Sequence, residues 1–132
     1  MSNALKEQKI SPKNFLNMFS QKNPVSRLLS SRITTSNLSD AMKHVKGENG
    51  VLTGVKPVTG NMKVVGKATT VKTRADDWGT AIKGIYAARK GDVLLIECNG
   101  DDPAVWGELA SGTAQDREIA ATVIYGSSPS PL

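Results

Sequence analysis

The sequence predicts an α/β fold that contains a βαβαβ unit and is preceded by N-terminal helices. Three segments have the composition of strands: residues 63–73 are rich in Val and Thr, and residues 92–96 and 120–125 are short and apolar. Two segments with helical periodicity separate them. Strands and helices that alternate at this spacing are typical of a parallel sheet with right-handed crossovers.

The composition is that of an ordinary globular protein. The chain has 132 residues, enough for one domain, of which 39% are hydrophobic and 22% are charged. No apolar run approaches the roughly 20 residues that span a bilayer, and no signal-peptide core is found near the N-terminus. Cys98 is the single cysteine, which excludes a disulfide within one chain. We therefore expect a cytoplasmic protein that is not associated with a membrane.

Residues 1–32 are expected to form a basic helical extension. They contain six Lys or Arg residues against Glu7 alone, whereas residues 33–132 contain eleven basic and eleven acidic residues. Ser11-Pro12 predicts the start of a helix in this extension. A basic arm can bind nucleic acid or acidic lipid, but this one lacks interleaved aromatic side chains and Gly-Arg repeats. We therefore expect a solvated basic helix, with neither nucleic acid nor membrane as a partner.

Two further helices are expected before the first strand. Asn23-Pro24 ends the helix of the extension, and a short helix begins at Val25. Thr35-Ser36-Asn37 predicts the cap of the next helix, which Gly47 ends. The apolar side chains of that helix follow the spacing that places them on one face: Leu38, Ala41, Met42 and Val45.

The helix between the first two strands is predicted from its cap and its apolar face. Asp76-Asp77 provides the cap, Gly91 ends the helix, and its apolar face is formed by Trp78, Ile82 and Ile85. The strand at residues 92–96 follows as a continuous apolar run, a pattern typical of strands that are buried on both faces.

The segment from Asp102 onward is the strongest candidate for a binding site. Asp102 and Pro103 suit the N-cap and first position of a helix, which would place the N–H groups of Gly107, Glu108 and Leu109 in its opening turns. Free N–H groups and the positive end of the helix dipole favour an anion. Ligands of parallel sheets bind beyond the carboxyl ends of the strands, here near residues 99–108. The sequence therefore predicts a binding site for a carboxylate or phosphate.

Other chemistries have less support. Residues 60–68 resemble a phosphate-binding loop, but five residues separate the glycines where four are needed, and the two valines favour a strand. His44 is the single histidine and is expected on the polar side of its helix, which argues against a histidine-based triad or a zinc site. Cys98 could be a nucleophile, but no histidine is near in sequence, and a buried small side chain is the simpler interpretation.

Two further groups leave alternatives open. The pairs Asp76-Asp77 and Asp101-Asp102 could bind a hard cation, or could simply be helix N-caps. Trp78 and Trp106 are expected to anchor the core beside the candidate site.

Several segments, in order, resemble the RraA-like family. They are residues 35–42, 65–71, 91–94, 104–109 and 123–126. The family includes the regulator of ribonuclease activity A and the 4-hydroxy-4-methyl-2-oxoglutarate aldolases, long labelled demethylmenaquinone methyltransferases. The resemblance is greatest to an archaeal branch in which this domain can be fused to a hexulose-phosphate synthase. It implies that residues 33–132 form a β/β/α sandwich with a glycine-rich cleft, in a homotrimer or hexamer with sites between subunits.

The resemblance also implies a site. In the aldolases of the family, an acidic residue is followed by twenty further residues and then by Arg-Asp. In this chain Glu108 occupies the acidic position, and residues 109–128 are the twenty that follow. The segment that matches the substrate-binding residues of the family is Gly107, Glu108, Leu109 and Ala110. The backbone amides and the Arg would hold a pyruvate-like carboxylate, and the Asp would bind Mg²⁺ or Mn²⁺, which stabilises an enolate. Here Pro129 and Ser130 occupy the Arg and Asp positions. We therefore expect that this chain does not bind the metal.

Two functions follow as alternatives. One is a domain with the ancestry of a divalent-metal-dependent 2-oxo acid lyase, an aldolase or oxaloacetate decarboxylase, inactive because of Pro129 and Ser130. The other is a non-catalytic binding or regulatory protein of the ribonuclease-regulator type. The segment after residue 126 differs from the family, and the domain is expected to be incomplete at its C-terminus. A natural end, an expression boundary and a frameshift all remain open.

Overall fold

The computed structural model describes residues 24–60, 62–99 and 105–126. The chain forms two compact units, residues 1–51 and residues 52–132, which are described separately. The helix predicted to begin at Ser11-Pro12 lies outside the described residues. Within the described residues, no helix has the length and apolar character needed to cross a membrane.

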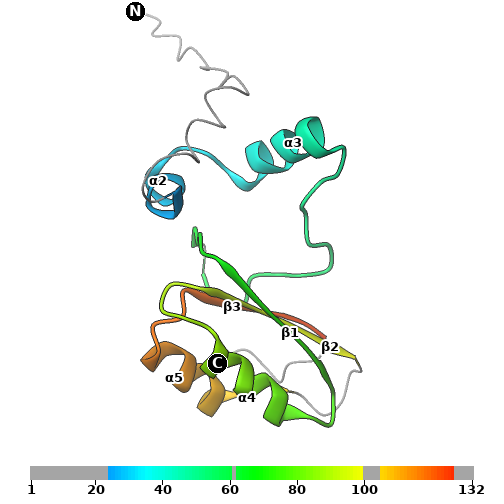
Figure 1. Ribbon diagram of the computed structural model, residues 1–132, viewed down its shortest axis with the longest axis vertical. Helices are drawn as coiled ribbons and strands as arrows, with labels where there is room; N and C mark the ends of the chain where they lie inside the picture. Colours follow the sequence, from blue (N-terminus) through cyan, green and yellow to red (C-terminus); the bar gives the residue numbers. More distant parts are fainter. Residues whose placement is uncertain (1–23, 61, 100–104, 127–132) are drawn as a thin grey trace, which may run out of the picture. The chain divides into compact units, whose positions relative to one another are not determined.

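The first unit contains two described helices, α2 (Pro24–Ser30) and α3 (Thr35–Lys46) (Figure 1). The cap of α3 is Thr34 rather than the predicted residues 35–37. Thr34 Oγ1 accepts from the Asn37 N–H at 3.3 Å, and the Thr34 N–H donates to Asn37 Oδ1 at 2.9 Å. This reciprocal capping box satisfies N–H groups that have no partner within the helix. The predicted end is confirmed, since Gly47 adopts the left-handed conformation with φ +77°.

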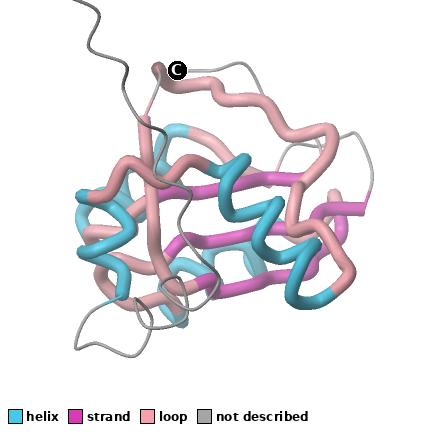
Figure 2. Tube along the Cα trace, turned by 90° about the horizontal axis from the view of Figure 1, so that it is seen from above, coloured by secondary structure: helices cyan, strands magenta, loops and turns pink. Residues whose placement is uncertain are grey.

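The second unit is the predicted βαβαβ unit. Its elements are β1 (Ala68–Arg74), α4 (Trp78–Ala87), β2 (Val93–Asn99), α5 (Glu108–Asp116) and β3 (Ala121–Tyr125). The strands form a parallel sheet in the order β1-β2-β3. Figure 2 shows the strands side by side. Strand β1 starts at Ala68 rather than at residue 63, because Ala68 pairs with Val93, the first residue of β2. The mixed α/β class is therefore confirmed.

Both helices of this unit lie on the same side of the sheet (Figure 1). The core between them and the sheet centres on Ile85, Leu94 and Ile96, which are almost fully buried. Burial in β2 alternates, because Val93 and Leu95 point to the other face and are only half-buried. The prediction that this strand is buried on both faces is therefore wrong for the described residues.

Two glycines allow close approaches that hold the unit together. A Cβ on Gly84 of α4 would collide with Val71 Cγ2 of β1, so this glycine sets the distance between helix and sheet. A Cβ on Gly126 would lie 2.6 Å from the Cys98 carbonyl oxygen. Gly126 also has φ +139°, a conformation that other residues rarely adopt. The close approach of Gly126 to Cys98 of β2 therefore requires glycine at this position.

The end of α5 has an unusual residue. Helix α5 ends in a Schellman motif in which the Glu118 N–H donates to the Gln115 carbonyl and the Ile119 N–H donates to the Ala114 carbonyl. Glu118 has φ +54°, the one described non-glycine residue with positive φ. This is the position where the resemblance implies a helix-ending glycine. The carboxylate of Glu118 forms an ion pair with Lys90 Nζ at 2.7 Å.

Asp92 connects several elements at the end of the sheet where the parallel strands begin. Asp92 Oδ2 accepts from the Arg89 N–H at 3.0 Å and from Thr69 Oγ1 at 2.9 Å. The Asp92 carbonyl accepts from the Ala120 N–H at 2.9 Å. One residue therefore connects β1, the end of α4 and the start of β3.

Candidate functional site

The predicted binding residues lie at the start of α5. Gly107 is the N-cap, and Glu108, Leu109 and Ala110 are the first three helical residues. The prediction that the helix begins at Asp102-Pro103 is wrong, because residues 105–107 are not helical and Gly107 is extended. Asp102 and Pro103 themselves lie outside the described residues. The predicted N–H groups nevertheless occupy the opening turn, where backbone donors have no partner within the helix.

No side chain caps these donors among the described residues. The first N–H that bonds within the helix is that of Ser111, which donates to the Gly107 carbonyl at 2.9 Å. Among the described atoms, nothing lies within 4 Å of the position that a Cβ on Gly107 would occupy. Packing against the described atoms therefore does not require glycine here, and its φ of −155° is open to any residue. Within the described part of the chain, glycine leaves open space at the N-cap, next to the N–H groups that follow it.

Trp106 and Ser111 hold this turn in place. Trp106 is half-buried and packs against the core cluster, as predicted for a core anchor. Its indole Nε1 donates to Ser111 Oγ at 2.9 Å, and Ser111 Oγ donates to the Gly107 carbonyl at 3.0 Å. The hydrogen bonds connect the N-cap to the core through one hydroxyl. The N-cap of α5 is therefore held in place by hydrogen bonds within the chain.

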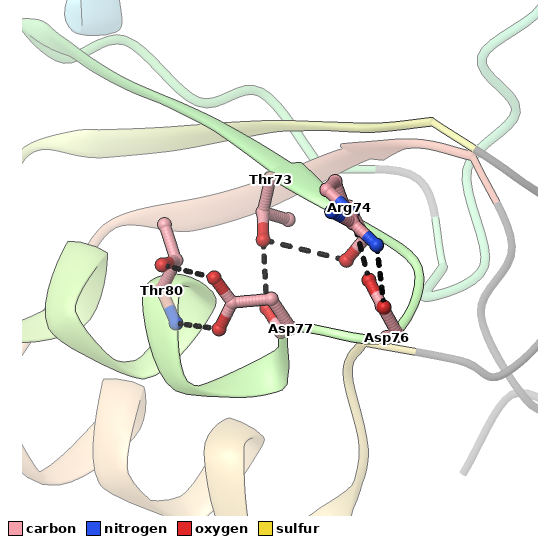
Figure 3. A network of polar contacts seen from close by, with 5 residues as sticks. All are labelled: Thr73, Arg74, Asp76, Asp77 and Thr80. Atoms are coloured by element: carbon pink, nitrogen blue, oxygen red, sulfur yellow. Dashed lines mark hydrogen bonds and ion pairs between the residues drawn. The ribbon is translucent and has the colours of Figure 1, made fainter.

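The other helix of the unit begins at the same edge of the sheet. Figure 3 shows that Asp77 caps α4, with its carboxylate accepting from the Thr80 hydroxyl at 2.7 Å and from the Thr80 N–H at 3.0 Å. These hydrogen bonds, first that of the Thr80 hydroxyl, lower the pKa of Asp77. The Thr73 hydroxyl donates to the Asp77 carbonyl at 2.7 Å. Asp77 is therefore an N-cap, as one of the two alternatives predicted.

Asp76 is also engaged within the chain. Its two oxygens accept from Arg74 Nε at 3.0 Å and Nη2 at 2.7 Å, a bidentate pair (Figure 3). The described part of the chain contains no group of three or more His, Cys, Asp or Glu residues that could hold a metal ion. Asp101 and Asp102 lie outside the described residues. The alternative in which Asp76-Asp77 binds a hard cation therefore has no support from the geometry.

Three other predicted residues can be placed. Cys98 is 5% exposed, and burial raises the pKa of its thiol, so it is the buried small side chain expected rather than an activated nucleophile. His44 is exposed on α3. Trp78, in contrast, is 68% exposed, so its prediction as a core anchor is wrong. It is the first residue of α4, at the end of the helix where the core no longer covers it.

The metal implied by the resemblance does not fit the residues of the described site. Glu108 is an exposed carboxylate at the start of α5, and its neighbours Gly107 and Leu109 offer no metal-binding side chain. Pro129 and Ser130 lie outside the described residues, and neither carries an anionic ligand of the kind that Mg²⁺ prefers. What the described site offers a ligand is a set of backbone N–H groups and the positive end of a helix.

Two contacts near the candidate site are not predicted by the sequence. Ser111 was not recognised as the link between Trp106 and Gly107, because the spacing of a hydrogen-bonded Trp and Ser is no general signal. Arg117 was also missed: its Nε donates to the Ile85 carbonyl at 3.2 Å, and its guanidinium lies 5.0 Å from the centre of the Tyr86 ring. It joins the end of α5 to the end of α4, where helix carbonyls lack partners.

The fold and this helix terminus define the class: an α/β domain with a parallel sheet and, among the described residues, no side-chain cap at the N-terminus of α5. A family model described as RraA-like, Aldolase/RraA, matches residues 35–128. The chain therefore belongs to the RraA-like family, and the resemblance of the sequence motifs is confirmed.

Three curated relatives are similar to parts of this chain. An uncharacterized protein of Methanocaldococcus jannaschii is 43% identical over 79 residues, covering 57% of this chain and 38% of that protein. A protein of Halalkalibacterium halodurans, provisionally named a 4-hydroxy-4-methyl-2-oxoglutarate aldolase, is 35% identical over 95 residues, or 71% and 44% of the two chains. Protein DlpA of Legionella pneumophila is 34% identical over 98 residues, or 70% and 16%. The match thus spans less than half the length of each relative.

Proposed function

We propose that the start of α5 binds the carboxylate of a small 2-oxo acid or a related anion. The observation that carries the proposal is the uncapped helix terminus: the N–H groups of Glu108, Leu109 and Ala110 have no side-chain acceptor among the described residues, and Gly107 leaves space beside them. Trp106 and Ser111 order this turn in advance, which lowers the entropy lost on binding. The provisional name of the Halalkalibacterium relative, an aldolase of a 2-oxo acid, supports a carboxylate as the anion.

We further propose that the ancestry of the domain is that of a divalent-metal-dependent 2-oxo acid lyase and that this chain is not itself catalytic. An enolate formed from a 2-oxo acid needs a positive charge near its oxygen. The described site contributes Glu108, which is negative, and positions 129 and 130 carry Pro and Ser in place of the implied Arg and Asp. Binding without catalysis is also what the alternative, a regulatory protein, requires.

Binding can be tested by the fluorescence of Trp106. Trp78 is exposed and would add signal, so the titration is made in Trp78→Phe protein. Oxalate or pyruvate should change the emission of Trp106 with saturation at about millimolar concentration, because a few backbone donors without a cationic side chain give only weak affinity. A folded protein that shows no saturation up to about tens of millimolar, where the binding free energy would be weaker than roughly −3 kcal/mol, would overturn the proposal.

A matched pair of glycine variants locates the site. Gly107→Ala should lower the stability by only about 1 kcal/mol, the cost of alanine at an N-cap, since its Cβ meets no described atom. It should weaken anion binding by about tenfold, because the methyl group fills the space beside the amides. Gly112→Ala is the control: its Cβ also meets no described atom, and it lies one turn further along α5. Equal affinity in both variants would show that the anion binds elsewhere.

The absence of catalysis is tested by magnesium-stimulated decarboxylation of oxaloacetate, the simplest reaction that needs only a stabilised enolate. The unmodified chain should show no rate above the metal alone. Pro129→Arg combined with Ser130→Asp restores a cation and a hard anionic ligand and should produce a small, metal-dependent rate. Activity in the unmodified chain that EDTA abolishes would refute the proposal that Pro129 and Ser130 inactivate it.

A further inference from the structure

Two adjacent residues outside the candidate binding site can react with each other without an enzyme. Asn49 and Gly50 follow α3 and are both exposed. An Asn side chain can be attacked by the backbone nitrogen of the next residue, and glycine is the residue that hinders this attack least, because it has no Cβ beside the nitrogen. The other Asn-Gly pair of the sequence begins at Asn99.

The hydrogen bonding at Asn49 favours the same attack. The Val51 N–H donates to Asn49 Oδ1 at 3.3 Å, which forms an Asx turn. The ring that this hydrogen bond closes contains both Asn49 Cγ and the peptide nitrogen of Gly50. The donated hydrogen bond also stabilises negative charge on Oδ1, the atom that becomes an oxyanion when Cγ is attacked. Val51 is itself 56% exposed, so hydroxide and water have access to the turn.

Asn37 provides a contrast within the same unit. Its Oδ1 accepts from the Thr34 N–H at 2.9 Å and from the Thr34 hydroxyl at 2.9 Å. The next residue, Leu38, lies within α3, and its N–H donates to the Thr34 carbonyl. A nitrogen whose N–H is held in a helix, next to a side chain fixed in a capping box, is poorly placed for attack.

We infer that Asn49-Gly50 is a site of spontaneous deamidation in the folded protein. The Gly50 nitrogen loses its proton and bonds to Asn49 Cγ, the Cγ–Nδ2 bond breaks, and ammonia leaves with that proton, giving a succinimide. Water then opens the ring at either carbonyl and yields aspartate or isoaspartate at position 49. Each product adds one negative charge, and isoaspartate adds one atom to the backbone, at the boundary between residues 1–51 and 52–132.

Hydroxylamine tests the inference directly, because it opens a succinimide and cleaves the chain there. The full chain carrying Asn99→Ser has one Asn-Gly pair and should yield the fragments 1–49 and 50–132. The native protein should react at least as fast as the same protein in concentrated urea, since the Asx turn places the reacting atoms together. A native rate well below the unfolded rate would overturn the inference, because the fold would then protect the bond.

Two proline variants separate the effect of the turn from general loop exposure. Val51→Pro removes the N–H that donates to Asn49 Oδ1 and should lower the native rate to the unfolded rate or below. Leu52→Pro is the matched control: Leu52 is 57% exposed, and the variant should react like its parent. An unchanged native rate in Val51→Pro would refute the role of the turn. Peptide mapping after incubation at alkaline pH should find deamidation at Asn49 and not at Asn37.

Discussion

The stability of this domain should change little when Glu118 is replaced by the glycine that its backbone conformation favours, because the gain and the losses nearly cancel. Glu118 has φ +54°, and a left-handed conformation costs a residue with a Cβ roughly 1–2 kcal/mol. Glycine avoids this cost but loses about 0.5–1 kcal/mol through the greater freedom of its unfolded chain. The ion pair with Lys90 is also lost, and an exposed pair of this kind contributes about 0.2–1 kcal/mol. The net effect of Glu118→Gly is therefore small, from about −1 to +1 kcal/mol.

Glu118→Ala isolates the backbone contribution. Alanine loses the same ion pair as glycine but keeps the conformational cost, so the glycine variant should be more stable than the alanine variant by about 0.5–1 kcal/mol. Urea unfolding followed by far-UV circular dichroism measures both, provided that the slope of the free energy of unfolding with urea is unchanged. Lys90→Ala measures the ion pair separately. An alanine variant as stable as the glycine variant would refute the assignment of strain to Glu118.

Three further predictions concern other parts of the domain. Gly84→Ala, a change that usually stabilises a helix, should instead lower the free energy of unfolding by about 1–3 kcal/mol, because its Cβ would collide with Val71; thermal unfolding gives the sign. Hydrogen bonds from the Arg89 N–H and the Thr69 hydroxyl lower the pKa of Asp92 below its ordinary value of 3.8, so its contribution to stability is complete above that pH and is lost as the pH falls through the lower folded-state pKa. Asp92→Asn should remove this part of the acid dependence, and an identical pH profile of urea midpoints would contradict it. We also propose that the chain is a homo-oligomer, a trimer or hexamer, because the described sheet has open edges at β1 and β3 and Leu109 is 88% exposed; a monomer in light scattering at about tens of micromolar would contradict this.

Local signals of the sequence predicted features of both units. The cap at Asp77 and the left-handed Gly47 depend on contacts between residues near in sequence, which a pattern can reveal. The alternation of strands and helices along the chain follows from the composition and periodicity of each segment. The start of β1 could not be predicted in this way. Residues 63–67 have the composition of a strand, but a strand requires a neighbour, and β2 begins only opposite Ala68. The extent of a strand is set by its partner, which lies 25 residues further along the chain.

The two tryptophans show the same limit for side chains. Trp78 shares a helical spacing with Ile82 and Ile85, so periodicity predicts that all three are buried. In the structure Ile85 is buried and Trp78 is 68% exposed. Periodicity predicts on which side of the helix a side chain lies, but not how far along the helix the core extends. Trp106 has no periodic pattern and is nevertheless packed on the core through the turn before α5.

The candidate site combines a feature that sequence could locate with one that it could not. The identities of Gly107, Glu108 and Leu109 predicted N–H groups near a helix start. Whether these groups lack a partner depends on where the helix begins, and this followed only when the helix was found to begin at Glu108 rather than at residue 103. In a helix capped by Asp102, the N–H groups of residues 107–109 would have donated to the carbonyls of residues 103–105. The later start gives the cap to Gly107, which has no side chain, so the error in the helix boundary strengthens the case for an anion at this terminus.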